Sequence, residues 1–592
     1  MRVGAFFQKN KCHFNVWAPF KNSVKLRLNG KDVPMKKIDT EYWSVSLPLK
    51  GGEKYYYNVD GKIRPDPASK FQPEGVHGPS QIINDNFSWE DKKWKAPELR
   101  ELIIYELHVG TFTKEGTLKA IIPKLEYLKK LGINAIEIMP VAQFPGNRNW
   151  GYDGVYPFAV QNSYGTPKDF KALVNECHKK GIAVILDVVY NHLGPEGNYF
   201  RDFGPYFTDK YKTPWGCALN FDDSYSDGVR NYFINNALYW LEEFHIDGLR
   251  LDAVQTIFDT SARPFLQELA EIVEKRYPNK YLIAESNLNK SSFIKSRRAG
   301  GYGLDAEWLD DFHHSLHAYI TDEKHGYYID YGKLTQITKC INKGHVYDGI
   351  YSKSRKCTYG DSSGNLDKEK FVVFIQNHDQ VGNRVVGERL SKLVDFAGLK
   401  TAAGLMLCSP FVPLLFMGEE YGETTPFLYF TNHSDKELGK AVKEGRKNEF
   451  KEFDWKEEPP DPQSHKTFNR SKLDWKKINN EKQKKMLEFY KDLIKLRKNK
   501  KFGGENKTKA ISYENKGLIT ISYGSGVFVV FNLGEQSTEF YLKGNYRKIF
   551  DSEDEKYNGR GSDCPKIIKN AKNIKFQKRS FVVFERRGEY FE

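Results

Sequence analysis

Short apolar and polar runs alternate along residues 1–95, with Gly, Asn, Lys and Pro residues between them. Examples are the runs CHFNVWAP, SVKLRLNG, YWSVSLPL and KYYYNVDG. A period of two places the apolar side chains on one face of a strand, and turn residues between such runs are typical of antiparallel sheets. The pattern predicts a small β-sandwich domain over residues 1–95, which includes a proline-rich wrapping linker at 64–80.

From about residue 101 the pattern changes to apolar strands followed by amphipathic helical segments. This alternation predicts a parallel sheet, because parallel strands are joined by crossovers that are usually helical. Eight segments have the strand pattern: 102–109, 134–141, 182–190, 248–254, 281–286, 303–309, 370–379 and 413–420. They predict an α/β fold, a (β/α)8 TIM barrel over residues 96–500.

Two further stretches complete the predicted organisation. Residues 191–245 follow the third strand and are rich in Gly, Pro and aromatic residues, so we expect a long active-site loop there rather than another barrel helix. After a Lys-rich helix at about 480–500, short β runs return. These runs predict a second β-sandwich domain over residues 501–592.

The composition of the 592-residue chain is that of a folded protein, since 39% of the residues are hydrophobic and 14% are aromatic. No apolar run reaches the about 18 residues that a membrane helix needs, and a charge comes too early for a secretory signal. We therefore expect a cytoplasmic protein with no membrane partner. The net charge of +14 is spread among interleaved acids without a nucleic-acid-binding motif, so we expect no nucleic-acid partner either.

Seven cysteines are spread along the chain and form no CxxC pair. This spacing argues against a zinc knuckle and against a dense disulfide framework, so we expect mostly reduced core thiols. Because the count is odd, a surface cysteine that joins two chains remains an open alternative. The sequence thus allows a monomer or a homodimer.

Polar residues gather where four of the predicted strands end, which is the catalytic end of a (β/α)8 barrel. The segments are DVVYNH (187–192), GLRLDAV (248–254), AES (284–286) and QNHDQ (376–380). They contain three acids, Asp252, Glu285 and Asp379. They also contain three basic or imidazole side chains, His192, Arg250 and His378.

Three carboxyl groups in one apolar-walled cleft suit glycoside cleavage, in which one acid is ionised and another is protonated. Taken singly, each acid could equally be a buried ion pair or a helix cap. The chain has no GxxxxGK[ST] loop, no GxGxxG after a strand and no HExxH, which argues against nucleotide, dinucleotide and zincin sites. The four segments together favour a glycosidase.

In this order, the four segments resemble the four signature regions of the α-amylase superfamily of retaining glycosidases and transglycosylases. The flanking β domains, with WAP at 17–19, are similar to the N-terminal glycan-binding-like module and the C-terminal β domain of that superfamily. Within it, five segments resemble the maltooligosyltrehalose trehalohydrolase family: 64–80, 149–167, 310–319, 376–384 and 416–430. The chain departs from the second signature region at Gln255, where His is often found.

The resemblance implies that Asp252 is the nucleophile, Glu285 the general acid and base, and Asp379 the stabiliser of the distorted sugar. The positions agree with these roles, since Arg250 lies two residues before Asp252 on a strand and can hold it ionised. Glu285 needs a raised pKa, which a partly desolvated site supplies. His192 would donate to sugar hydroxyls as a neutral imidazole.

Further binding residues follow from the same resemblance. His378 would act like His192, also as a neutral imidazole, and Tyr152 would stack under the glucose at the cleavage site. Asp311, His313 and His314 would recognise trehalose, although a hydrogen-bonded loop brace is an equal alternative. Trp215, Tyr206 and Phe207 could be sugar platforms, but a core role is at least as probable for each of these three aromatics.

The resemblance implies a hydrolase that cleaves the α-1,4 bond next to the terminal trehalose of maltooligosyltrehalose, a neutral oligosaccharide. It also implies no metal, no cofactor, and a maltooligosyltrehalose synthase as functional partner. Acidic residues near Asn191 lack an EF-hand spacing, which agrees with the absence of calcium. The alternatives are a glycogen branching or debranching enzyme on the same barrel and a catalytically silent glycan-binding protein.

Overall fold

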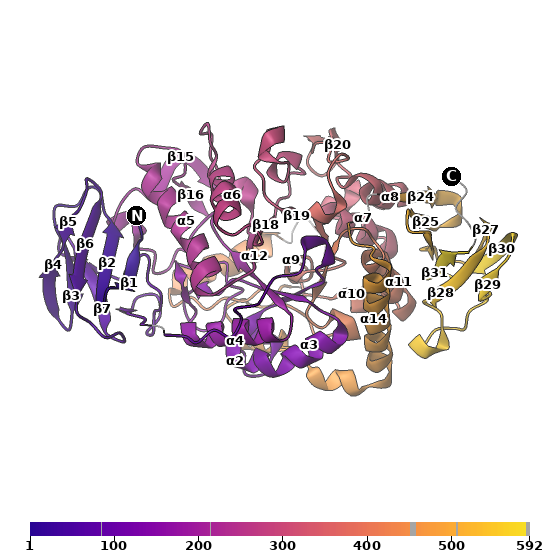
Figure 1. Cartoon of the computed structure of the whole chain (residues 1–592), viewed down its shortest axis with the longest axis horizontal. Helices are drawn as coiled ribbons and strands as arrows, with labels where there is room; N and C mark the ends of the chain where they lie inside the picture. The colour runs from indigo at the N-terminus through magenta and orange to yellow at the C-terminus, as the bar shows by residue number, and fades with distance from the viewer. Residues whose placement is uncertain (85, 214, 450–457, 505–506, 588–592) are drawn as a thin grey trace.

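The computed structural model describes residues 1–84, 86–213, 215–449, 458–504 and 507–587. A closed barrel occupies the middle of an elongated molecule, with one antiparallel β unit at each end (Figure 1). The predicted fold class is thus confirmed.

Two antiparallel sheets form the N-terminal β unit. The first contains β1 (Gly4–Gln8), β2 (Lys11–Trp17), β6 (Tyr42–Leu47) and β5 (Lys36–Lys37). The second contains β4 (Lys31–Pro34), β3 (Val24–Leu28), β7 (Lys54–Val59), β8 (Lys62–Arg64) and β9 (Ser80–Gln81). Phe14 of the first sheet meets Tyr55 of the second edge to face, with ring centroids 5.0 Å apart, so the apolar faces of the two sheets share one core.

Eight parallel strands close the barrel. In spatial order they are β10 (Ile104–Leu107), β11 (Ala135–Ile138), β14 (Ala183–Val188), β17 (Gly248–Leu251), β18 (Tyr281–Ala284), β19 (Ala306–Trp308), β22 (Phe371–Val373) and β23 (Val412–Phe416). Nearly every residue of these strands is buried, because helices cover the outside and side chains fill the inside. This is why the strands are continuous apolar runs in the sequence.

Helices surround the barrel. The longer ones are α3 (Leu125–Leu131), α4 (Pro167–Lys179), α5 (Ser226–Glu243), α6 (Phe265–Arg276), α7 (Asp310–Thr321), α8 (Leu334–Lys343), α11 (Phe396–Leu407), α12 (Lys436–Glu449) and α14 (Glu481–Lys500). The start of α4 shows how local sequence sets these bounds. Thr166 and Asp169 form a capping box there, and Pro167 occupies the first turn, where a backbone N–H is not needed.

Short helices and two-stranded sheets lie in the connections between the main strands and helices. The short helices are α1 (Val109–Phe112), α2 (Leu118–Ile121), α9 (His378–Gly382), α10 (Leu390–Leu393) and α13 (His465–Arg470). The short strand pairs are β12 (Ala142–Gln143) with β13 (Tyr156–Val160), β15 (Phe207–Thr213) with β16 (Gly216–Leu219), and β20 (Ile350–Ser352) with β21 (Cys357–Tyr359).

The prediction of a loop without a helix over 191–245 is wrong from Ser226 onward. Residues up to 225 form irregular structure and the β15–β16 hairpin, but α5 follows from Ser226. Val229, Phe233 and Ala237 are buried at four-residue spacing, which is the signature of an amphipathic helix. The Gly-, Pro- and aromatic-rich composition of the residues before Ser226 obscured this helical periodicity in the sequence.

The C-terminal β unit also has two sheets. One contains β24 (Thr508–Tyr513), β25 (Leu518–Tyr523), β26 (Val527–Asn532), β31 (Ser580–Arg586), β28 (Tyr546–Asp551) and β29 (Ile567–Ile568), and the other pairs β27 (Thr538–Lys543) with β30 (Ala571–Phe576). Phe581 of β31 lies directly against Gly404 of α11, where a Cβ would come within 2.2 Å of the ring. The C-terminal unit therefore packs on the barrel without a gap at this point.

A similar contact joins the N-terminal unit to the barrel. The fully buried Trp17 of β2 lies against Gly228 of α5, and a Cβ at this glycine would come within 2.0 Å of the indole. The indole N–H donates to Glu41 Oε2 at 2.7 Å, which fixes the ring in place. Among the described residues, no helix combines the length and apolar character needed to span a membrane.

We predict that Gly228→Ala lowers the midpoint of thermal unfolding, because the indole of Trp17 has to shift to admit the methyl group. Overpacking of this kind costs about 1–3 kcal/mol. Gly445→Ala on α12 is the matched control, since that helical glycine has no neighbour within 4 Å of an added Cβ. The control should leave the midpoint unchanged or raise it. Equal midpoints for both variants, measured by calorimetry, would contradict the tight contact.

Candidate active site

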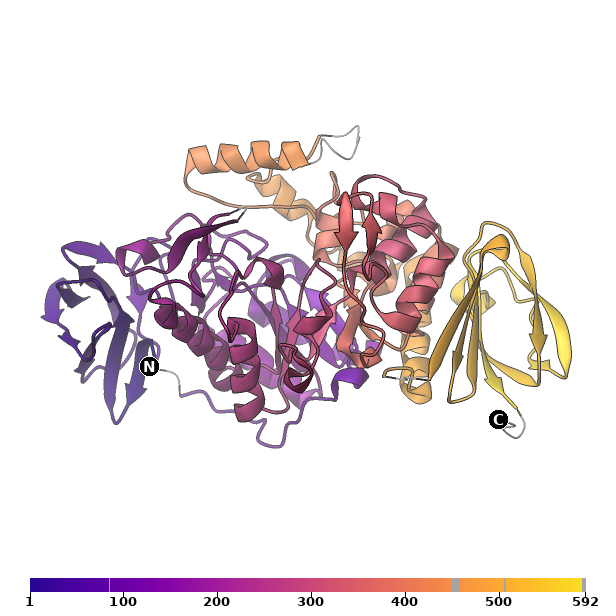
Figure 2. The same cartoon turned by 90° about the horizontal axis from the view of Figure 1, so that it is seen from above.

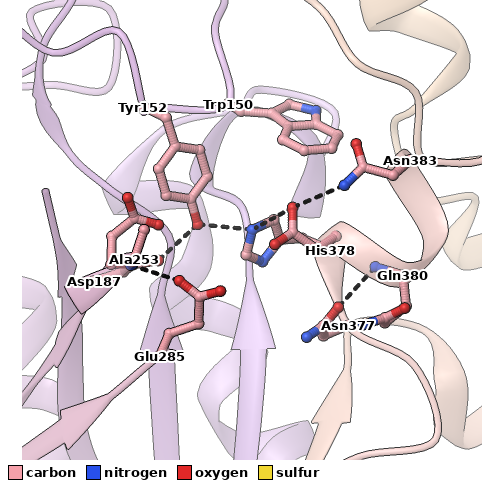
Figure 3. A network of polar contacts seen from close by, with 12 residues as sticks. Trp150, Tyr152, Asp187, Ala253, Glu285, Asn377, His378, Gln380 and Asn383 are labelled. Carbon is pink, nitrogen blue, oxygen red and sulfur yellow. Dashed lines mark hydrogen bonds and ion pairs between the residues drawn. The ribbon is translucent and has the colours of Figure 1, made fainter. Parts of the chain in front are cut away.

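Charged side chains converge where β14, β17 and β18 end, as expected for a barrel of this type. Asp187 of β14 and Arg250 of β17 are paired in register. Asp252 and Glu285 follow directly after β17 and β18. Neighbouring parallel strands thus bring Arg250 to Asp187, 63 positions away, and Ala253 to Glu285, 32 positions away, in one cluster, part of which Figure 3 shows.

One guanidinium lies at the centre of this cluster. Arg250 is fully buried, and its Nη1 lies 2.7 Å from Asp187 Oδ2 and 3.0 Å from Asp252 Oδ1, while its Nη2 lies 3.4 Å from Glu285 Oε2. Burial alone would lower the pKa of Arg250, but the surrounding acids outweigh it and raise the pKa well above its usual value. Asp252 and Glu285 therefore share a permanently charged partner.

The two acids also receive separate hydrogen bonds. Asn191 Nδ2 donates to Asp252 Oδ2 at 2.7 Å. The backbone N–H of Ala253 donates to Glu285 Oε2 at 2.5 Å, from a turn in which Ala253 has a φ of 39°. Their side chains are 13% and 15% exposed, which leaves an open edge for a ligand.

Glu285 has a strongly shifted proton affinity. Burial raises the pKa of Glu285 to about 7; the guanidinium of Arg250 opposes the shift, and the negative charges of Asp252 and Asp379 add to it. Near neutral pH, the carboxyl group of Glu285 is therefore protonated in a large fraction of molecules. The Asp252 carboxylate, by contrast, lies against a charged Nη1 and an amide N–H, both of which stabilise a negative charge.

Asp379 lies at the first turn of α9 and is the most open of the three acids, with 38% of its side chain exposed. Its Oδ1 lies 3.5 Å from His378 Nε2 and accepts a hydrogen bond from Asn383 Nδ2 at 3.3 Å. The three predicted catalytic acids thus surround one site.

The structure differs from our expectation of a neutral His378. Its Nδ1 lies 2.5 Å from Glu106 Oε1, and its backbone N–H donates to Glu106 Oε2. Burial would lower the pKa of His378, but the carboxylates of Glu106 and Asp379 outweigh it and raise the pKa to about 9. His378 is therefore an imidazolium at neutral pH.

Tyr152 lies between His378 and Asp187 (Figure 3). Its hydroxyl is 2.8 Å from His378 Nε2 and donates to Asp187 Oδ2 at 2.7 Å. Its ring is nearly parallel to the imidazole of His378. Tyr152 is thus part of the cluster, with its ring orientation fixed by both neighbours.

His192 reaches the same region from the loop after β14. Its Nε2 donates to the carbonyl of Tyr152 at 2.9 Å, and burial lowers its pKa, so it is neutral as expected. The half-exposed Trp215, beyond the cluster, stacks on the His192 ring with a centroid distance of 4.2 Å. The other two aromatics of the insertion differ: Tyr206 is a buried core residue, whereas Phe207 is partly exposed under Arg201.

A pocket extends from Glu285 and Asp379 over the loops after β18, β19 and β22. Residues that line it include Asn287, Asp310, His314, Tyr327, Asp330, Arg355, Tyr359, Gln380 and Asn383. Burial, with the negative charges of Glu285 and Asp379, raises the pKa of Asp310 well above its usual value. The protonated form of Asp310, which can donate a hydrogen bond, is therefore favoured more than in an ordinary aspartic acid.

Two of the residues predicted to recognise trehalose have partners within the protein. Asp311 is 2% exposed and accepts hydrogen bonds from Tyr331, Asn289 and the backbone of Val346. This is the arrangement of a brace. His313 is buried as well, with its ring nitrogens next to the Ile375 carbonyl and the Tyr328 hydroxyl. His314 lines the pocket, and Asp311 borders it too, although these protein partners hold its carboxylate.

Sequence reasoning missed several members of the site. Glu106 had a local signal, since it is a single acid in the apolar segment LIIYELHV. Asp310 had none, because adjacent residues of a helix differ in direction by about 100° and the resemblance does not say which one faces the site. Gln255 is not a member of the acid cluster, and its Oε1 is buried without a hydrogen-bond partner among the described residues.

No part of the chain that the structure describes contains three or more His, Cys, Asp or Glu side chains grouped as metal ligands. Asn191 is committed to Asp252, donating to both its side chain and its carbonyl. Independence of metal stays a prediction.

Known proteins resemble this chain over nearly its whole length. The family model described as alpha amylase, catalytic domain, matches residues 81–215 and 219–503. A malto-oligosyltrehalose trehalohydrolase from Saccharolobus solfataricus is 50% identical, over 92% of this chain and 95% of the relative. A 1,4-alpha-glucan branching enzyme from Geobacillus stearothermophilus is 30% identical, over 69% of this chain and 67% of the relative.

The structural comparison agrees with the sequence comparison. A crystal structure from Salmonella typhimurium, of a protein provisionally assigned as an alpha amylase, superposes with a TM-score of 0.90 at 36% identity. The match covers 99% of both chains, including the two flanking β units. The chain therefore belongs to the α-amylase family and, within it, to the malto-oligosyltrehalose trehalohydrolases.

Proposed function

We propose that this chain is a retaining glycoside hydrolase that cleaves the α-1,4 bond next to the terminal trehalose of maltooligosyltrehalose. The observation that carries the chemistry is the pair of acids on one buried guanidinium, of which Glu285 has a raised pKa. Because Asp252 and Glu285 both contact the guanidinium of Arg250, their carboxyl groups lie near one another, as double displacement with retention requires. The substrate follows from the names of the relatives that match most of the chain.

In the first step, Asp252 attacks the anomeric carbon of the glucose next to trehalose. The bond between this carbon and the O4 oxygen of trehalose breaks, and the proton of Glu285 goes to that oxygen. The malto-oligosyl chain becomes an ester of Asp252 and trehalose leaves. Arg250 stays charged throughout and stabilises the carboxylate before attack.

In the second step, water attacks the same anomeric carbon from the side that trehalose has left. Glu285, now a carboxylate, accepts the proton of this water, and the ester bond to Asp252 breaks. Two inversions at one carbon give net retention of the α configuration. Both acids return to their starting protonation states.

The charged His378 and Asp379 have a joint role in this proposal. Asp379 Oδ1, at the exposed edge of the cluster, can accept a hydrogen bond from a hydroxyl of the reacting glucose. The buried His378 already contacts Glu106 and Tyr152 through its two ring nitrogens, so its positive charge, 3.5 Å from Asp379, acts on this carboxylate rather than on a sugar hydroxyl. Glu106 behind His378 keeps the imidazole charged and fixes its ring. Tyr152 offers its ring edge and face to the same sugar.

The pocket beyond Glu285 and Asp379 is our proposed site for trehalose. It offers the carboxyl of Asp310, the imidazole of His314 and the guanidinium of Arg355, which suit the many hydroxyls of a disaccharide. Asp311 borders this pocket but is already engaged by protein groups, as is the buried His313, so we propose that both support the pocket rather than bind the sugar.

We also propose a cytoplasmic location and a maltooligosyltrehalose synthase as functional partner. The substrate carries a trehalose unit at the end of an α-1,4 chain, so another enzyme must convert a reducing end of a maltodextrin to that linkage. The two enzymes act in sequence and need no contact.

Product analysis tests the proposed function. We expect trehalose and a shortened maltooligosaccharide after incubation with maltooligosyltrehalose. A branching enzyme would instead act on amylose to form α-1,6 branches, and a debranching enzyme would release linear chains from a branched glucan. Either product pattern without trehalose, or no sugar release from any α-glucan, would contradict the proposal.

We predict that Asp252→Ala abolishes turnover and that Glu285→Gln lowers kcat by at least about 10²-fold, the usual contribution of general acid catalysis. A glycosyl fluoride needs no proton for departure and azide needs no general base to attack, so azide should restore part of the rate on this substrate in Glu285→Gln and give a glycosyl azide of retained configuration. In Asp252→Ala, azide can instead replace the missing nucleophile, and the glycosyl azide then has the inverted configuration. Unchanged thermal midpoints check that both variants fold. Near wild-type turnover in either variant would exclude the mechanism.

The pH profile follows from the pKa of Glu285, which is about 7 in the free enzyme. The first step needs the protonated form, so kcat/KM should be half-maximal near pH 7 and fall by about tenfold per pH unit at pH values well above the pKa. Initial rates at substrate concentrations far below KM measure this limb. A decline that begins near pH 5, close to an ordinary glutamic acid, would show that Glu285 is not the acid.

A further inference from the structure

Helix α12 lies at the catalytic end of the molecule and stands apart from the barrel wall. It is the orange helix at the top of Figure 2 and belongs to the long connection between β23 and α14. Of its 14 residues, Gly439 is the one that is buried. Most of α12 therefore contributes little to the core.

Arg446 of α12 contacts the rest of the protein, and its side chain is only 10% exposed. The guanidinium lies over the ring of Tyr429, with 4.9 Å between its carbon and the ring centroid. Its Nη1 donates to Asn383 Oδ1 at 2.9 Å, and its Nη2 donates to the carbonyl of Gly382. Arg446 thus joins α12 to the end of α9, the helix that carries Asp379 in its first turn.

The contact with Arg446 determines how the amide of Asn383 is turned. A guanidinium can only donate hydrogen bonds, so it selects the amide oxygen of Asn383. The amide nitrogen then points to Asp379, where Nδ2 donates to Oδ1 at 3.3 Å. A continuous path of two hydrogen bonds therefore runs from α12 to the carboxylate of Asp379.

The backbone under this path is held in place. A Cβ at Gly382 would come within 2.1 Å of the indole of Trp150, so the end of α9 fits tightly against that ring. The indole N–H of Trp150 donates to the carbonyl of Leu428, and its ring meets Tyr429 edge to face. Arg446 covers the ring of Tyr429. Trp150 therefore contacts both Gly382 at the end of α9 and the aromatic ring on which Arg446 lies.

We infer that Arg446 is a positioning residue, which orients Asp379 through Asn383 and so couples α12 to the catalytic site. The inference rests on the proposed role of Asp379 at the reacting sugar. Asp379 is the acid with the most exposed side chain of the three, and the imidazole of His378 lies 3.5 Å from it. An oriented amide therefore restricts the directions in which this carboxylate can turn.

The test compares Arg446→Met, Arg446→Lys and Asn383→Ala with the unchanged protein. If Asp379 binds the sugar most strongly in the transition state, misorientation lowers kcat more than it raises KM. We expect kcat to fall about tenfold in Arg446→Met, a loss typical of one hydrogen bond to a charged group. Lysine keeps a donor at this position and should restore part of kcat.

The double variant Asn383→Ala/Arg446→Met separates positioning from a general effect of α12. If Arg446 acts through Asn383, the double variant is no slower than Asn383→Ala alone. The control is Lys443→Met, on the same helix, which removes the surface ion pair with Asp461 and should leave kcat unchanged. Thermal midpoints of all variants are measured in parallel.

Three results would overturn the inference: full kcat in Arg446→Met, independent losses that multiply in the double variant, or an equal loss in Lys443→Met. The ratio of each variant's kcat to that of the unchanged protein is measured on any α-glucan that the unchanged protein cleaves. Failure of the unchanged protein to release trehalose would therefore count against the proposed function, while the variant ratios still decide the role of Arg446.

Discussion

A single buried positive charge organises the catalytic end of this barrel. Arg250 has no exposed side-chain surface, and a bare guanidinium in such a place would cost several kcal/mol. Asp187 from the neighbouring strand provides the nearest compensation, and Asp252 and Glu285 lie on the same group. Because β14 and β17 are paired in register, closure of the barrel itself brings the charges together. The fold and the chemistry thus depend on the same contact.

The environment then makes similar side chains different. Asp252 and Glu285 share a cation, yet Glu285 lies farther from it, and burial together with the charges of Asp252 and Asp379 raises the pKa of Glu285 to about 7. The two histidines differ for the same kind of reason. Glu106 keeps His378 charged, whereas burial keeps His192 neutral. Differences of this kind allow one site to offer both acids and bases at one pH.

The sequence predicted the barrel well because strands that are buried on both faces are continuous apolar runs. It failed at α5, whose helical period was hidden by the loop composition before Ser226. The acids at strand ends were predictable, since strand position alone assigns them to the catalytic end. The contact between Asn383 and Arg446 was not predictable, because these residues are 63 positions apart and only the folded chain brings them together.

Two aromatic rings that fit closely against glycines, one at each β unit, restrict how these units can move relative to the barrel. The ring of Trp17 lies against Gly228, and the ring of Phe581 lies against Gly404. A hinge motion of either β unit has to withdraw an aromatic ring from a close-fitting seat and expose it to water, which is unfavourable. We therefore expect the two β units and the barrel to move as one rigid body. The loops around the entrance of the site, such as the β15–β16 and β20–β21 hairpins, then have to accommodate the oligosaccharide.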